Sequence, residues 1–308
     1  MDRLAAVLMK VDRRRLAVFP DGWGDDAGLD LFSAVERAAP GPLSPVWEPK
    51  EEHPGYRLRR GRATSPVADA LPAEARVLDF EMIEPGTGSD RLCVLLPAWN
   101  DHGFAQRRRV AVALARRRIA SVYFHPPFYG SRRVVPEPRQ AVRTVADFGR
   151  LGFGTVVEAL SLLSLFDTRR GIAGFSMGAT LGALATAASP WPVAATLVAP
   201  APSPAPVYLE GTLWHALSWK ALGGRSNRRR LRATLDQASV LSLPPPAWQQ
   251  STILVAARAD RFVPPTATVR LAAHWPQATL RWTDGGHAAL ARRHDLLVEA
   301  VVDAFGSL

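Results

Sequence analysis

The sequence predicts an α/β fold with a mainly parallel, eight-stranded sheet that has helices on both faces. From residue 56 onward, short runs of apolar, strand-forming residues recur, and after residue 92 most of them are separated by segments of helix length. Strands that alternate with helices form right-handed crossovers and hence a parallel sheet covered on both faces. Between residues 198 and 252 no strand pattern occurs, which predicts a helical insertion.

The first 54 residues are predicted to form an N-terminal extension to a main domain at residues 55–308. Two short helices are expected in it. Their apolar positions at helical spacing are Leu4, Val7, Leu8 and Val11 in the first, and Leu31, Phe32 and Val35 in the second. A proline-rich passage from Pro40 to Pro54 follows, which is typical of a linker or of an extended segment laid across a surface.

Eight strands are expected in the main domain. The first two or three follow each other too closely for crossover helices, so they should begin the sheet as an antiparallel meander. The expected strands are Tyr56 to Arg60, Val77 to Met82, Leu92 to Leu96, Ala120 to Phe124, Ile172 to Phe175, Ala194 to Val198, Thr252 to Ala256 and Thr279 to Trp282.

The segment at about 201–248 is predicted to be a helical cap, bounded by prolines on both sides. Apolar residues from Leu209 to Leu217 indicate one helix, which should end at Gly223-Gly224. Leu231, Leu235 and Val240 indicate a second helix.

Composition excludes several classes of protein. With 308 residues, 47% hydrophobic and 21% charged, the chain has the mix of a globular protein with a sizeable core. Cys93 is the only cysteine, so there is no intrachain disulfide and no cysteine metal cluster, and a reducing cytoplasm is the simplest location. The apolar run from Leu4 to Met9 is too short for a signal peptide or a membrane span. We expect no transmembrane segment, no metal and no cofactor.

The net charge of +10 is unevenly distributed along the chain. Residues 1–90 hold 12 basic and 16 acidic side chains, so the excess of positive charge belongs to the remainder. Arginine runs at 107–109, 116–118 and 228–230 invite a nucleic acid as partner. However, no helix-turn-helix, RNP or zinc pattern accompanies them, and charge runs on helices are usually solvated faces. We therefore expect no nucleic-acid partner.

The most informative motif is Gly174-Phe175-Ser176-Met177-Gly178. It joins a short apolar strand to a helix of small residues, so Ser176 should lie on a strand-to-helix turn. This G-x-S-x-G arrangement is that of a nucleophile elbow, in which the flanking glycines allow a sharp turn that exposes the hydroxyl. The alternative is a glycine-rich turn with a capping serine.

A nucleophilic serine needs a base and an orienting acid, which in this architecture follow it in the order acid, then histidine. Asp260 lies just past the strand that starts at Thr252, and His287 lies in the loop before the last helix. We expect these two residues and Ser176 at one edge of the sheet.

Each partner has competitors in the sequence. Asp260 could instead cap a helix or pair with a neighbouring arginine, and Asp284 and Asp236 are the rival acids. His287 could instead cap the final helix, and His294 is its rival but reads as part of a solvated face. His274, which ends a helix, is expected to be structural.

The tetrahedral oxyanion of acyl transfer needs two backbone N–H donors. One should be the amide of Met177. The other should come from the loop after the strand Leu92 to Leu96, where the amide of Trp99 or of Asn100 is best placed. Pro97 has no N–H to give.

With these motifs the chain resembles the α/β-hydrolase superfamily over roughly residues 55–308. Within the superfamily it is similar to the α/β-hydrolase domain-containing protein eighteen type. The matching positions are Asp101-His102, Phe128 to Arg132, Ala146 to Phe148 and Gly174 to Gly178. The resemblance implies a serine hydrolase of acyl esters, lipids included. Trp99 and Asn100 depart from the small residues expected beside the oxyanion site, which reduces the room there.

The predicted function is that of a metal-independent serine hydrolase of a small-molecule or lipid acyl ester. An acyltransferase with the same three residues, a catalytically silent binding module and a nucleic-acid-binding protein are the alternatives. Tyr208, Trp214 and Trp219 in the cap would suit an apolar acyl chain, or they could simply pack the cap onto the core. Basic residues beside such a pocket would suit an anionic ester or contact with a membrane surface.

Overall fold

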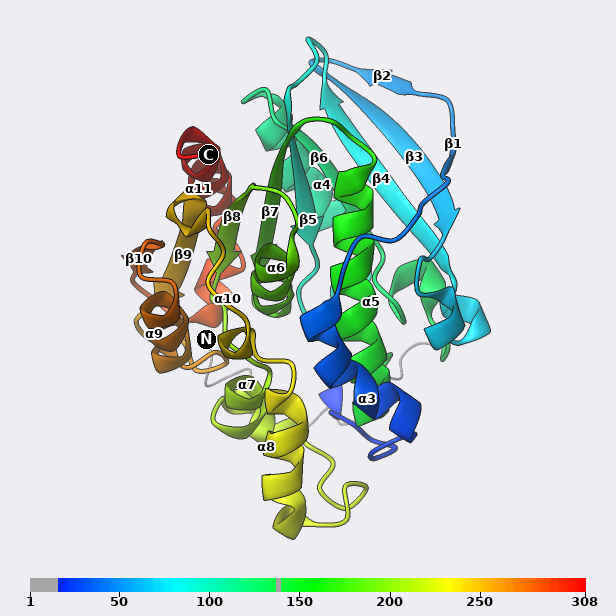
Figure 1. The fold of residues 1–308 in the computed structure, drawn as a ribbon, viewed down its shortest axis with the longest axis vertical. Coiled ribbons are helices and arrows are strands. Elements are labelled where there is room, and N and C mark those ends of the chain that lie inside the picture. The colour runs from blue at the N-terminus through cyan, green and yellow to red at the C-terminus, as the bar shows by residue number, and fades with distance from the viewer. Residues whose placement is uncertain (1–15, 137–139) are drawn as a thin grey trace.

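A mixed sheet of ten strands forms the centre of the computed structural model (Figure 1), which describes residues 16–136 and 140–308. The strand order is β1-β3-β4-β6-β5-β7-β8-β9-β10, with β2 paired to β3. The strands are β1 (Val46–Trp47), β2 (Glu51–His53), β3 (Tyr56–Thr64), β4 (Val77–Pro85), β5 (Arg91–Leu96), β6 (Ala120–Phe124), β7 (Arg169–Phe175), β8 (Val193–Val198), β9 (Thr252–Ala257) and β10 (Thr279–Thr283). The predicted α/β architecture is confirmed.

The predicted number of eight strands was too low by two. All eight expected strands are present, and the additional two, β1 and β2, come from the proline-rich passage and pair antiparallel with β3. They have two and three residues, prolines flank them, and Val46 is 75% exposed. Strands this short, at a sheet edge, bury too little to leave an alternating apolar pattern in the sequence.

The antiparallel start of the sheet contains the first two expected strands and not the third. β3 pairs antiparallel with β4, and β4 then pairs antiparallel with β6. The third expected strand, β5, lies between β6 and β7 and is parallel to both. From β6 to β10 the sheet is therefore parallel, with the carboxyl ends of its strands at one edge.

Helices cover both faces of the sheet. In Figure 1, α3, α5 and α6 lie in front of the sheet, whereas α4 and α11 lie behind it. One buried apolar cluster lies on each side. The α-helices outside the cap are α3 (Asp26–Ala34), α4 (Ala105–Ala115), α5 (Val145–Ser164), α6 (Met177–Ala188), α9 (Pro265–His274), α10 (His287–Leu290) and α11 (His294–Gly306). The shorter 3-10 helices there are η1 (Val35–Arg37), η2 (Ala68–Ala70), η3 (Ala73–Ala75), η4 (Gly130–Arg132) and η8 (Gln249–Ser251).

Of the two helices expected in the N-terminal extension, the second is present as α3. The side chain of Asp25 caps it by accepting from the amide of Gly28, and Phe32 is buried. The apolar positions of the first expected helix lie outside the described residues.

The segment between β8 and β9, called the cap segment below, contains the two expected helices, but the first of them is broken. It consists of α7 (Ala205–Leu209), η5 (Thr212–Ala216), η6 (Arg225–Asn227), α8 (Arg228–Asp236) and η7 (Val240–Ser242). A single helix to Gly223-Gly224 was wrong because Gly211 separates α7 from η5. A Cβ at Gly211 would lie 2.0 Å from the carbonyl oxygen of Phe262, so the chain at Gly211 packs closely against the loop after β9, which contains Asp260.

Candidate active site

Ser176 lies between β7 and α6 with φ of +56°, a backbone conformation that L residues rarely adopt. The two glycines of the motif explain how this turn is accommodated. A Cβ at Gly174 would lie 2.4 Å from the carbonyl carbon of Gly178, and a Cβ at Gly178 would lie 2.7 Å from the carbonyl oxygen of Leu96. The absence of both Cβ atoms thus lets the strained turn form and pack directly on the loop after β5.

Three side chains from three strand ends are hydrogen-bonded in a row. His287 Nε2 lies 2.9 Å from Ser176 Oγ, and His287 Nδ1 lies 2.7 Å from Asp260 Oδ2. They follow β7, β9 and β10, whose carboxyl ends share one edge of the sheet. The structure brings the three predicted residues together.

The carboxylate of Asp260 is fixed from its other side. Its Oδ1 accepts hydrogen bonds from the amides of Phe262 at 2.8 Å and Val263 at 2.9 Å, which leaves Oδ2 for the imidazole. The side chain is only 2% exposed and that of His287 is 12% exposed. This arrangement makes Nδ1 of His287 the protonated ring nitrogen and Nε2 the acceptor that faces Ser176.

Two aromatic rings flank the imidazole. Phe175 lies 4.6 Å from it between ring centroids, and Phe262 is stacked on it at 5.1 Å. The rings restrict how far His287 can rotate away from Ser176 and reduce the access of water to it. Sequence reasoning missed this role, although both rings adjoin predicted site residues.

The rival residues lie elsewhere. The side chain of Asp284 is 99% exposed and lies near Arg258, and Asp236 accepts a hydrogen bond from Ser203 within the cap segment. His274 lies 2.9 Å from the carbonyl oxygen of Leu243, in keeping with its expected structural role. His294 begins α11 instead of joining the hydrogen-bonded row.

The loop at residues 97–103 adjoins the turn at Ser176. The backbone amides of its two candidate donors, Trp99 and Asn100, differ in their hydrogen bonds. The amide of Asn100 donates to the phenol oxygen of Tyr129 at 3.2 Å. Burial raises the pKa of Tyr129 well above its ordinary value, so the phenol stays neutral. Within the described ranges, the amides of Met177 and Trp99 make no hydrogen bond to a protein acceptor.

Arg107 anchors the same loop. Its guanidinium donates to Asp101 Oδ2 at 2.9 Å and to the carbonyl oxygens of Gly103 and Phe124. The residue is 5% exposed, so its expected place on a solvated helix face was wrong. Burial lowers the pKa of Arg107, and Asp101 opposes that shift. Arg107 lies three residues before Val110 and seven before Leu114, so the three residues share one face of the helix. This spacing in the sequence could have indicated that Arg107 is buried.

A cavity of about 200 Å³ opens against Ser176 and His287. Its walls are mainly apolar and come from the loop after β5, from α5 and α6, and from the cap segment. The lining residues are Leu16, Ala98, Trp99, Phe148, Phe175, Ser176, Met177, Thr180, Leu181, Pro204, Val207, Tyr208, Leu213, Phe262 and His287. Of the three cap aromatics considered, Tyr208 alone lines this cavity.

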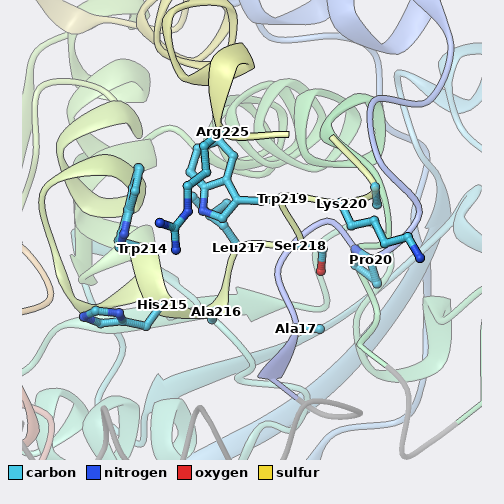
Figure 2. A pocket seen from close by; sticks show the side chains of 11 residues that line it. Ala17, Pro20, Trp214, His215, Ala216, Leu217, Ser218, Trp219, Lys220 and Arg225 are labelled. Atoms are coloured by element: carbon cyan, nitrogen blue, oxygen red, sulfur yellow. The ribbon is translucent and has the colours of Figure 1, made fainter. Parts of the chain in front are cut away.

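A larger cavity of about 940 Å³ lies beside the cap segment and contains none of the three hydrogen-bonded residues (Figure 2). Trp214 and Trp219 line it, with ring centroids 4.6 Å apart, together with Lys220 and Arg225. The two indoles therefore shape a surface outside the row of Ser176, His287 and Asp260.

Among the described residues, no group of three or more His, Cys, Asp or Glu side chains is arranged to hold a metal ion. None of the helices described is long and apolar enough to span a bilayer.

Several solved structures share this fold at low sequence identity. A cold-adapted esterase from an Arctic intertidal metagenomic library matches with a TM-score of 0.58 and 19% identity, covering 85% of this chain and 99% of that chain. An acetyl xylan esterase from a Paenibacillus species gives 0.58 and 13%, covering 93% and 99%. Acetyl xylan esterase 1 from a Thermoanaerobacterium species gives 0.57 and 12%, covering 95% and 97%.

These likenesses establish the α/β-hydrolase fold. A family model described as alpha/beta hydrolase domain containing 18 matches residues 18–226 and 224–307, almost the whole chain. The protein therefore belongs to the alpha/beta hydrolase domain containing 18 family.

Proposed function

We propose that the protein is a serine hydrolase that cleaves carboxylic esters through an acyl-enzyme. The observation that carries the proposal is the continuous hydrogen-bonded row from Ser176 through His287 to Asp260, at 2.9 and 2.7 Å. A serine hydroxyl is a weak nucleophile, and an imidazole held by a buried carboxylate is the group that activates it.

The reaction would proceed in two halves. His287 Nε2 takes the proton of Ser176 as its oxygen attacks the ester carbonyl, and Asp260 stabilises the imidazolium. The imidazolium then protonates the departing alcohol, which leaves the acyl group on Ser176. Water enters, gives a proton to His287 and attacks the acyl carbon, and that proton returns to Ser176 as the acid leaves.

For the oxyanion we propose the amides of Met177 and Trp99. Of the two candidates in the loop after β5, Asn100 already donates its amide to Tyr129. The amide of Trp99 makes no hydrogen bond to a protein acceptor within the described residues. Each such donor typically contributes 10²–10³ in rate.

The proposed substrate is an ester with an apolar acyl group, a small molecule or a lipid, because the cavity beside Ser176 has mainly apolar walls. Nucleic acid is less well supported, since some arginines of these runs contact other groups of the protein, whereas Arg116 to Arg118 are exposed. Arg108 is hydrogen-bonded to Glu81, and Arg230 lies 3.9 Å above the ring of Trp23.

A fluorophosphonate probe and p-nitrophenyl esters test the proposal. We expect the probe to label the wild type and not Ser176→Ala. We expect His287→Ala to lose at least about a thousandfold in kcat while its circular dichroism is unchanged. Ser218→Ala is the matched control, because Ser218 lines the larger cavity and should be labelled like the wild type. Labelling of the Ser176→Ala variant would contradict the proposal.

A further inference from the structure

We propose that Phe148 and Leu181 close the inner end of the acyl pocket and set the longest acyl chain that the enzyme accepts. The inference rests on the proposed function and goes beyond it, because it assigns a specificity role to two residues outside the hydrogen-bonded row. It predicts an esterase that accepts only short acyl chains and whose limit in chain length changes when Phe148 or Leu181 is substituted.

A second, smaller cavity of about 20 Å³ lies beyond the acyl pocket. Phe148, Leu181 and Pro204 line both cavities, so these three residues form the partition between them. The far side of the small cavity is apolar as well and is formed by Phe32 and Val35 among others. The two cavities thus lie on opposite sides of one apolar partition.

The ring of Phe148 spans the partition. It contacts Trp99 and Tyr208 on the pocket side, at centroid distances of 5.8 and 5.4 Å, and Phe32 on the far side at 6.0 Å. Leu181 approaches from α6, one turn after the serine elbow. Phe148 and Leu181 are each 4% exposed, so this partition is a packed part of the core.

The volume of the pocket limits the chain. At about 200 Å³ it is smaller than the roughly 300–1,000 Å³ of pockets that bury drug-sized ligands. Burial of one methylene contributes about fourfold to kcat/KM, at roughly 0.8 kcal/mol each. In the wild type this gain should stop once the chain reaches Phe148 and Leu181. Removal of the partition should let it continue into the second cavity.

The experiment measures kcat/KM for p-nitrophenyl esters with acyl chains from two to twelve carbons. We expect the wild type to prefer chains of about six carbons or fewer. Leu181→Ala should raise the ratio of the ten-carbon to the four-carbon ester at least about tenfold. Phe148→Leu should act in the same direction, and it keeps more of the packing than an alanine would, since the ring contacts four other rings.

Gly152 offers the matched reverse change. It lies four residues after Phe148 on α5 and lines only the second cavity, and its added Cβ would meet Leu181 Cδ2 at an ordinary 3.6 Å. Gly152→Leu alone should not lengthen the accepted chain, because it adds bulk behind Leu181. In the Leu181→Ala background it should restore bulk from the opposite wall and bring the preference back toward that of the wild type.

The outcomes separate this inference from the function on which it rests. If the wild type neither hydrolyses esters nor reacts with the fluorophosphonate, the proposed function fails. If the wild type hydrolyses ten- and twelve-carbon esters as well as four-carbon esters, the partition does not limit the chain. Folded Leu181→Ala and Phe148→Leu variants with an unchanged profile would likewise overturn it.

Discussion

At the scale of single residues, the close approach of Gly178 to the loop after β5 sets the geometry of the proposed oxyanion site. A Cβ there would lie 2.7 Å from the carbonyl oxygen of Leu96 and 2.8 Å from that of Pro97, so the backbone itself would have to move. We expect Gly178→Ala to lower kcat about 10²–10³-fold, as when one oxyanion donor is lost. Ester kinetics and the rate of fluorophosphonate labelling measure this loss.

Gly182 on the same helix is the matched control. An added Cβ there would come within 2.9 Å of Leu197 Cδ2, the end of a side chain that can shift, and its other nearest atoms are also side-chain atoms, not backbone. Gly182→Ala should therefore change the melting temperature more than kcat. Equal losses of kcat in the two variants would show that the contact between position 178 and the loop after β5 does not determine the rate.

Residue patterns in the sequence pointed to the three hydrogen-bonded residues that we propose as nucleophile, base and acid, because each carries a local signature. Ser176 has its glycines, and Asp260 and His287 each follow a recognisable strand. Contacts between distant segments leave no such signature. The hydrogen bond from Asn100 to Tyr129 joins residues that are 29 apart in the sequence. The ring of Phe148 lines the pocket because α5 packs against Tyr208 of the cap segment.

At the scale of elements, Arg107 couples α4 to the loop at 97–103 and to β6. Arg107→Met keeps much of the side-chain length but removes three hydrogen-bonding partners and leaves Asp101, 18% exposed, without its cation. Breaking such a pair typically costs about 3–5 kcal/mol of stability. Because the loop holds the amide of Trp99, we expect kcat to fall at least about tenfold while KM changes less than about threefold.

The neighbouring Arg109 is exposed on the same helix and is the natural comparison. Arg109→Met should change the free energy of unfolding by less than about 0.5 kcal/mol and leave kcat as it is. A role for Arg107 in stability alone would instead lower the melting temperature and leave kcat of the folded fraction unchanged.

Elements were predictable from sequence to the degree that they bury a periodic face. Seven of the eight predicted strands contain apolar residues that the fold buries, whereas β10, at the edge of the sheet, contains none and was predicted from its strand-forming residues alone. β1 and β2 escaped prediction because strands of two and three residues at an edge are mostly exposed. The first cap helix was overestimated because its apolar spacing continues past Gly211, where contact with Phe262 stops the helix.

At the scale of the whole molecule, His125 at the end of β6 links stability to pH. Burial lowers its pKa from 6.5 to about 4, and the charge of Arg107 adds to the shift. Its ring is stacked on Phe104 at 3.9 Å, and Nδ1 lies 3.1 Å from Ser131 Oγ. Ser131 donates its own hydrogen to Asp79, so Nδ1 of the neutral imidazole must be the donor to Ser131.

The sign of the effect follows from proton binding. Between pH 6.5 and 4 the unfolded chain binds a proton at His125 that the folded chain does not, so stability falls as the pH is lowered through that window. The loss should amount to about 2 kcal/mol after allowance for partial exposure. Urea unfolding at pH 7.0, 5.5 and 4.5 should show the wild type losing more stability than His125→Gln, which has no proton to gain. Parallel losses in the two proteins would mean that the imidazole is charged in the folded state, and that its burial against Phe104 does not keep it neutral.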